Sequence, residues 1–317
     1  MEQPIDTKLI DIGNEPIVSL LDILLKDKST KKNIIWATDT YEKFGKSFTD
    51  KEQIKKATLL QHSDIIKPRI QKAEVEQQER TKKKAEVFTP SWLCNKMNNY
   101  LDEDWFGRKD VFNIENEDHT WTVVEDPIQF SEERTWKQYV DSRRLEITCG
   151  EAPYLVSRYD TSTGDLIVPP LHRIGFLDRK LRIVNENAPN HDEWLKWTER
   201  AVQSCYGYEY QGDNLLLARI NILLTYVEYY QDRFSNDPDK KTLLKIANII
   251  AWNIWQMDGL KGTIPFGSLA HEYRQMTIFD MMEEQPDKDE EIPCRIYDWR
   301  ANRSIPYISL KKNKERE

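Results

Sequence analysis

The feature that most constrains the fold of this chain is an alternation of short β-prone runs and amphipathic helices. One β-prone run ends at Cys149, and a second, residues 205–210, follows the helical pattern of residues 191–204. Residues 214–234 show the strongest helical periodicity of the chain, and a further helix is expected over residues 240–254. Strands that alternate with helices in this way predict an α/β domain with a mostly parallel sheet.

The remaining segments predict less regular structure around this α/β core. We expect a helix over residues 17–26, a strand over 33–41, two helices within 50–85 that Pro68 separates, a helix-like segment over 154–160, a turn-rich excursion over 161–190 and a last strand over 292–299. Gly212 and Asp213 are expected to end the second strand and to cap the long helix after it. The chain is thus divided into a mainly helical region, residues 1–84, and an α/β domain, residues 85–317.

Composition narrows the class of protein. The 317 residues suffice for one large or two smaller domains, and the net charge of −8 is opposite in sign to that of a typical nucleic-acid binder. The four cysteines are far apart and form no C-x-x-C pair, so neither a metal site nor a disulfide framework is expected. No signal peptide and no apolar run of about 18 residues is seen, which predicts a cytoplasmic protein without a membrane contact.

A local basic stretch is compatible with an acidic protein, because charge can be distributed unevenly over its surface. Basic residues gather before residue 85, and they allow two interpretations: a solvated helix face, or a surface that contacts DNA phosphates. The candidate phosphate contacts are Lys67, Arg69, Lys72, Lys82, Lys83 and Lys84.

Small or acidic residues stand where three of the predicted strands end. Gly150 and Ala152 permit a ligand to approach the backbone after the first strand. Glu209 ends the second strand, where a carboxylate can accept both hydroxyls of a ribose, and Asp258 ends the third, where a carboxylate can accept an exocyclic amine. Each signal is weak alone, and their order and spacing carry more weight.

Four segments together resemble the adenine-N6 DNA methyltransferases of restriction–modification systems, in the group whose cofactor-binding half comes first. These segments are "AEVFTPSWLCNKM" (85–97), "EITCGEAPYL" (146–155), "YGYEYQGDNLLLARIN" (206–221) and "NIWQMDGL" (253–260). They are similar to the Phe-Thr-Pro turn beside the methionine part of the cofactor, the cofactor loop, the acidic-strand motif, and the motif whose Asp contacts the adenine amine.

The resemblance implies a Rossmann-like S-adenosylmethionine-dependent methyltransferase sheet with an N-terminal helical region. It also implies S-adenosylmethionine as cofactor and DNA as partner. The implied cofactor contacts are Phe88, Thr89, Pro90, Glu146, Thr148, Cys149, Gly150, Ala152, Pro153, Tyr154, Leu155, Glu209, Tyr210, Asp258, Gly259 and Leu260.

Two departures from the family pattern bear on activity. Ala152 stands where glycine is commoner, and residues 260–317 contain no Asn-Pro-Pro-Tyr or Asp-Pro-Pro-Tyr. That motif orients the flipped adenine and stacks on it, so no catalytic residue is assigned here. The resemblance therefore implies a cofactor-binding part that is inactive alone, with a second polypeptide supplying the catalytic motif and the target-recognition domain.

Several alternatives stay open at this point. The chain could be a fragment, a split-gene subunit or a degenerate copy, and a non-catalytic scaffold of a DNA-modification or defence complex would use the same fold. A Rossmann-type oxidoreductase is disfavoured, because the first turn has one glycine where G-x-G-x-x-G has three.

Overall fold

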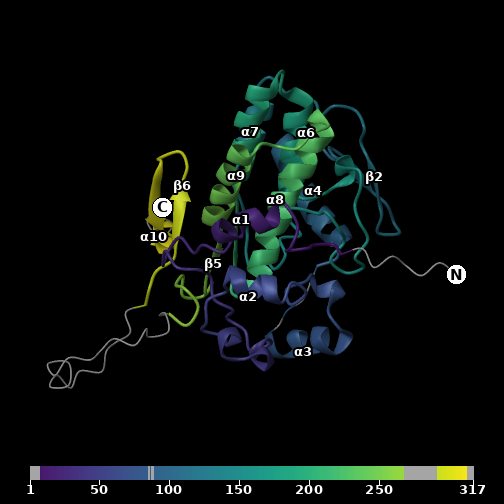
Figure 1. The fold of residues 1–317 in the computed structure, drawn as a ribbon. Coiled ribbons are helices and arrows are strands. Elements are labelled where there is room, and N and C mark those ends of the chain that lie inside the picture. The colour runs from purple at the N-terminus through teal and green to yellow at the C-terminus, as the bar shows by residue number, and fades with distance from the viewer. Residues whose placement is uncertain (1–7, 85, 87–88, 268–290, 313–317) are drawn as a thin grey trace.

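A small parallel sheet lies at the centre of the α/β fold. The computed structural model describes residues 8–84, 86, 89–267 and 291–312 (Figure 1). Its central strands are β3 (Arg144–Glu146), β4 (Cys205–Glu209) and β5 (Ile254–Gln256), hydrogen-bonded in the order β3-β4-β5. Both strand pairs are parallel, with Glu146 opposite Gly207 and Glu209 opposite Gln256. The predicted α/β class and parallel sheet are thus confirmed.

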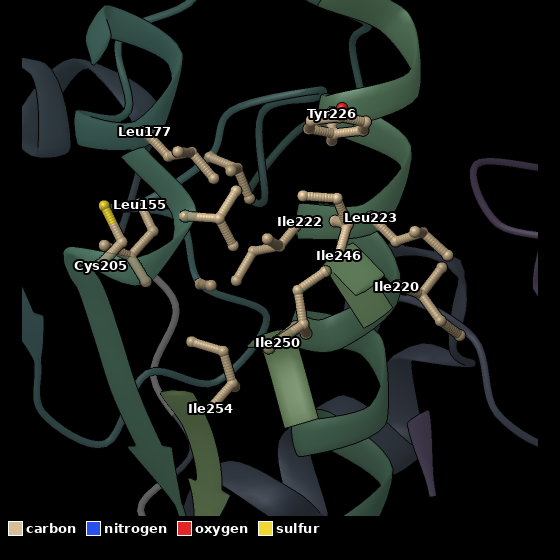
Figure 2. Close-up of a cluster of buried hydrophobic side chains, with 14 of the residues drawn as sticks. Leu155, Leu177, Cys205, Ile220, Ile222, Leu223, Tyr226, Ile246, Ile250 and Ile254 are labelled. Carbon is tan, nitrogen blue, oxygen red and sulfur yellow. The ribbon is translucent and has the colours of Figure 1, made fainter. Parts of the chain in front are cut away.

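Two helices connect each pair of neighbouring strands, as parallel pairing requires a long crossover. The connecting helices are α6 (Phe176–Asn187) and α7 (His191–Gln203) before β4, and α8 (Gly212–Phe234) and α9 (Lys240–Asn253) before β5. Helix α8 is buried along most of its length, because it is apolar on nearly every side. Its side chains Ile222, Leu223 and Tyr226 meet Ile246 and Ile250 of α9 in the core above the strands (Figure 2).

The N-terminal segment wraps around this core. It contains α1 (Ile17–Leu24), the 3-10 turns η1 (Glu42–Phe44) and η2 (Lys46–Phe48), α2 (Lys56–Gln61), the turn η3 (Arg69–Gln71) and α3 (Glu74–Lys84), followed by α4 (Ser91–Phe106). Helix α1 packs on α9 and α8, and its apolar residues belong to the same hydrophobic cluster as theirs. The two predicted regions therefore share one core, while the boundary at residue 84 stays a prediction.

The remaining elements lie at the periphery of the core. They are the antiparallel pair β1 (Asn113–Glu115) and β2 (Trp121–Val123), α5 (Trp136–Asp141), the turn η4 (Pro170–His172), the antiparallel pair β6 (Arg295–Asp298) and β7 (Arg303–Pro306), and α10 (Ile308–Lys312). The predicted last strand is thus confirmed over 295–298, but it forms a separate sheet with β7.

One face of the central sheet is covered unevenly. Residues of β6 and of the segment after β5 form a second apolar cluster with Tyr208 and Trp255. Leu145 of β3 lies opposite Tyr206 in the register, so it points to the same face, yet it is 47% exposed. Ile147 just beyond β3 is 62% exposed. The second cluster therefore covers β4 and β5 and leaves β3 open.

Two secondary-structure predictions are wrong for identifiable reasons. Residues 33–41 form only isolated bridges, between Asn33 and Lys26 and between Ile35 and Gln53, and no continuous strand. Toward β5, the side-chain amide of Gln256 replaces a strand-to-strand pairing: it accepts from the Ile35 N–H (2.9 Å) and donates to the Ile35 carbonyl (2.8 Å). The helix expected after Pro153 is only a turn, and the real helix, α6, lies inside the expected turn-rich excursion.

The expected cap of α8 is also wrong. The N-cap residue is Gln211, without a side-chain capping bond, and Asp213 lies inside the first turn. Its carboxylate instead accepts hydrogen bonds from Tyr41 and Lys72 of the N-terminal segment. Asp213, which the local sequence suggests as a helix cap, is therefore part of a tertiary contact.

Candidate cofactor-binding site

A cavity of about 860 Å³ opens where β3 and β4 end. Ligands of open α/β sheets bind at the carboxyl ends of the strands, and the size lies within the range of small-molecule sites. Its walls come from three segments far apart in the sequence, together with Ala37 and Phe176. The lining residues of these segments are Glu86, Thr89, Met97, Asn98 and Leu101; Arg143–Gly150, Pro153, Tyr154 and Leu155; and Glu209, Tyr210, Gln211 and Asn214.

The structure brings most of the expected cofactor contacts together around this cavity. Those that line it are Thr89, Glu146, Thr148, Cys149, Gly150, Pro153, Tyr154, Leu155, Glu209 and Tyr210. Pro90 and Ala152 belong to the same two segments but do not line it, and Phe88 lies outside the described residues.

The motif after β5 is not part of the cavity wall. Asp258 Oδ1 accepts from the N–H groups of Leu260 (3.0 Å) and Lys261 (3.2 Å), so the carboxylate stabilises its own turn. Leu260 is 95% exposed. Gly259 packs so closely on Tyr208 that an added Cβ would lie 2.7 Å from its ring. Asp258, Gly259 and Leu260 thus take part in packing and turn formation beside the end of β4, and they do not line the cavity.

The loop after β3 has an unusual backbone. Thr148, Gly150 and Ala152 have φ angles of 46°, 53° and 67°, in the left-handed region that favours glycine. The Ala152 N–H donates to the Cys149 carbonyl (2.7 Å), which closes the turn. The left-handed backbone therefore explains why small residues follow the strand. Position 152, where the family pattern has glycine, is a position that glycine would adopt without strain.

Two buried carboxylates hold this loop in place. Glu146 accepts from the N–H groups of Tyr154 (3.3 Å) and Leu155 (3.1 Å). Glu209 accepts from the N–H of Gly150 (2.9 Å) across the sheet and from that of Gln211 (3.1 Å). Each carboxylate therefore ties one strand end to a neighbouring turn.

Burial dominates the titration of both groups. Desolvation raises the pKa of Glu146 to about 8, and the two backbone N–H groups offset only part of that effect. Desolvation likewise raises the pKa of Glu209, against the hydrogen bonds from Gln211 and Gly150. At neutral pH Glu146 is therefore mostly protonated in the folded chain.

A third carboxylate, that of Glu86, reaches the cavity from the segment between α3 and α4. Its Oε2 atom accepts from Arg80 Nε (2.7 Å), Asn214 Nδ2 (3.1 Å) and Gln211 Nε2 (3.4 Å). Its Oε1 atom is buried and accepts no hydrogen bond among the described residues. On two other side chains that line the cavity, Asn98 Oδ1 is buried and accepts no hydrogen bond, and Arg144 Nε is buried and donates none, among the described residues.

Behind the cavity, a buried ion cluster joins the N-terminal segment to the start of α8. Asp213 accepts from Tyr41 Oη (2.7 Å), and it forms ion pairs with Arg80 Nη2 (2.9 Å) and Lys72 Nζ (3.3 Å). Burial by itself raises the pKa of Asp213, but Arg80 and Lys72 outweigh it and hold the pKa below its usual range. This cluster fixes α3 against the helix that carries Asn214.

The burial of Lys72 contradicts part of the phosphate-contact hypothesis. Lys72 is 4% exposed and paired with Asp213, so it cannot reach a DNA backbone without leaving the core. Arg69 is half-buried, and its backbone N–H donates to Glu151 Oε1 (2.7 Å). Lys67 is half-buried and Lys82 is exposed. The side chains of Lys83 and Lys84 are outside the described part of the structure.

Sequence reasoning missed several residues of the cavity wall. Glu86 stands two positions before Phe88 and would have required attention to the residues before the Phe-Thr-Pro turn. Gln211 and Asn214 follow Glu209 at the start of α8, where polar side chains face the strand ends. Asn98 carries no sequence signal, because it is one of three asparagines in α4 and nothing local distinguishes it from the other two.

Comparisons with known proteins add no relative. No protein-family model matches this chain, and neither a curated protein nor a solved structure does. Within the described residues, no helix is long and apolar enough to cross a membrane. The same residues contain no group of three or more His, Cys, Asp or Glu side chains arranged to hold a metal ion.

Proposed function

We propose that this chain is the S-adenosylmethionine-binding part of an adenine-N6 DNA methyltransferase of a restriction–modification system. One observation supports this most: Glu86 and Thr89, residues from the segment 146–155, and Glu209 and Tyr210 border a single cavity at the strand ends. These three groups are separated by more than fifty residues each, so their convergence does not follow from sequence proximity.

The residues around the cavity suit this cofactor. The volume of about 860 Å³ is sufficient for a nucleoside joined to an amino acid. Glu209 would accept the ribose hydroxyls, and the left-handed turn at Gly150 leaves the backbone open to the methionine part. Buried acceptors without a partner, Glu86 Oε1 and Asn98 Oδ1, match a ligand that is rich in donors. When bound, the cofactor supplies an electrophilic methyl group on its sulfonium sulfur.

The finer fold proposal is a Rossmann-like methyltransferase sheet of which this chain provides one half. In doubly wound sheets of order 3-2-1-4-5-6, the first three strands form a parallel half whose first strand adjoins the second half. The order β3-β4-β5 matches such a first half, and no described strand pairs with the outer edge of β3. We therefore propose that a second polypeptide, with the catalytic motif and target-recognition domain, continues the sheet beside β3.

A non-catalytic scaffold of a DNA-modification or defence complex is the second candidate. Both oxygens of Glu209 already accept backbone N–H groups, which favours a structural use of this carboxylate. Ligand binding separates the two proposals, because a scaffold has no need of the cofactor.

Thermal unfolding with and without ligands tests the proposal. A cofactor that binds only the folded chain stabilises it by about 2.7 kcal/mol at a hundredfold excess over its dissociation constant. We expect stabilisation by S-adenosylmethionine and by S-adenosylhomocysteine, and none by NAD. Stabilisation by NAD alone would instead favour the oxidoreductase alternative.

A methyl-transfer assay tests whether catalysis requires the second polypeptide. The exocyclic amine of adenine must be held in line with the methyl group, and positioning provides most of the acceleration. We expect radiolabelled transfer to mixed-sequence DNA only when a polypeptide with the Asn-Pro-Pro-Tyr motif is added. Transfer by the isolated chain would contradict this requirement.

A further inference from the structure

The carboxylate of Glu86 is half satisfied. Its side chain is 4% exposed and lines the cavity, and its Oε1 atom accepts no hydrogen bond among the described residues. Arg69 Nε forms an ion pair with Oε1 at 4.0 Å, which is beyond hydrogen-bonding distance. A buried carboxylate oxygen without a donor is costly to a folded protein. A bound ligand that donates a hydrogen bond to Oε1 would remove that cost.

The other oxygen explains why Glu86 cannot turn away from the cavity. Oε2 accepts from Arg80, from Asn214 of α8 and from Gln211, the residue before that helix. Arg80 is itself fixed by its ion pair with Asp213 (2.9 Å). These contacts to Oε2 therefore hold the other oxygen, Oε1, at the cavity wall.

The chemistry of an acceptor with a negative charge defines the matching group. A carboxylate oxygen accepts only, so the ligand must donate, and a cationic donor forms the stronger, charge-assisted hydrogen bond. In the cofactor of the proposed function, the ribose hydroxyls and the adenine amine are neutral donors, and the sulfonium has no proton. The ammonium of the amino-acid end is the one group with both protons and a positive charge.

We infer that Glu86 Oε1 binds the ammonium group of the amino-acid end of the cofactor. This inference rests on the proposed function and assigns to Glu86 a contact that the resemblance did not include. It places the amino-acid end near the start of α4 and α8, and leaves Glu209 for the ribose.

Calorimetry with two ligands and two proteins tests the inference. S-adenosylhomocysteine is compared with its deaminated analogue, which lacks only the amine, on the natural chain and on Glu86→Gln. Glutamine retains an oxygen for Arg80 and presents an NH₂ donor to the cavity in place of Oε1. We expect the amine to improve binding by about 10- to 100-fold in the natural chain and by less than about threefold in the variant.

A control variant separates binding from folding. Arg80→Lys weakens the support of Oε2 but leaves Oε1 in place, so the preference for the amine should persist even if both ligands bind more weakly. If Glu86→Gln fails to fold, Glu86→Asp replaces it, because aspartate keeps the charge but withdraws the oxygens from the cavity. A weaker preference for the amine in Glu86→Asp supports the assignment, and an unchanged preference overturns it.

Each other outcome overturns the inference. An equal loss of both ligands in Glu86→Gln means that Glu86 binds the nucleoside or supports the fold. Equal affinity of the natural chain for both ligands means that no residue of the cavity binds the ammonium group. If the natural chain binds neither ligand, the proposed function fails as well, which distinguishes that result from a failure of the Glu86 assignment alone.

Discussion

Replacement of Glu146 by glutamine should remove a large pH dependence of stability. Burial raises the pKa of this carboxyl from its usual 4.5 to about 8 in the folded chain. The folded state therefore keeps a proton that the unfolded state releases, and the stability that depends on this proton is complete below pH 4.5 and is lost as the pH rises through 8. At about 1.4 kcal/mol for each pH unit, this one group accounts for about 4–5 kcal/mol.

Glutamine is a good mimic of the protonated acid. Its carbonyl oxygen accepts from one of the two backbone donors, Tyr154 or Leu155, and its amide group carries no charge. The second backbone donor then has no acceptor, so Glu146→Gln should be less stable than the natural chain by about 1–3 kcal/mol at pH 4.5. Its stability should fall much less as the pH rises, so that the difference narrows or reverses at pH 8 and above.

Urea denaturation of both proteins from pH 4.5 to pH 9 measures this difference. The difference between the two curves isolates residue 146, because all other titrating groups are common to both proteins. Glu103→Gln, on a side chain that is 42% exposed, controls for the removal of one carboxylate from the chain. A difference that stays constant over the whole pH range would refute the reasoning about Glu146.

Three further predictions concern the ion cluster, the loop and the basic segment. Asp213→Asn leaves Lys72 without its buried counter-charge and Arg80 with Glu86 alone, and it should lower the free energy of unfolding by about 3–5 kcal/mol in urea denaturation. A loss under about 1 kcal/mol would contradict the cluster. Thr148→Gly should stabilise the chain by about 1 kcal/mol in thermal unfolding, because φ is positive at this position. The control Thr122→Gly, in β2, should destabilise the chain. Stability changes of the same sign in both variants would refute backbone strain at Thr148. Lys82→Ala should weaken DNA retention at low salt without loss of stability, whereas Lys72→Ala should lower stability. Equal effects of the two on gel shifts would contradict the burial of Lys72.

The parallel sheet was predictable because its signals are local and strong. The stretch 205–234 contains a short apolar strand, a turn and a long apolar helix, and the structure has β4 and α8 there. The turn after β3 was predictable from its small residues, since a left-handed backbone restricts which side chains fit.

Helix α6 lies within a segment that its turn residues assigned to an irregular excursion, and several charged residues stand among its buried apolar ones. Asp178, Arg179 and Lys180 are all buried, although such residues usually lie on the surface. Each has a distant partner that no local pattern reveals: Arg179 forms an ion pair with Asp102, and Lys180 donates to Ser204 (2.6 Å). Burial of charge is a tertiary property that no local pattern reveals, but the apolar spacing of Leu177, Leu181 and Val184 was a local signal for this helix.

The cavity wall shows the same division between local and distant signals. Gly150 and Glu209 follow strands and could be named from the sequence. Glu86 enters the wall only because Arg80, itself paired with Asp213, holds it against α8. Asp258 reads as a strand-end carboxylate, but its local bonds to the following turn keep it out of the wall.

Calorimetric titration of the purified chain with S-adenosylmethionine tests the central proposal most directly. We predict one binding site per chain, together with a 10- to 100-fold loss of affinity in Glu209→Ala, about 1–3 kcal/mol, because this variant removes a buried acceptor of the cavity. Glu103→Ala, on the exposed side of α4, should bind like the natural chain. Absence of both binding heat and thermal stabilisation at millimolar cofactor would contradict the assignment of the cavity as a cofactor site.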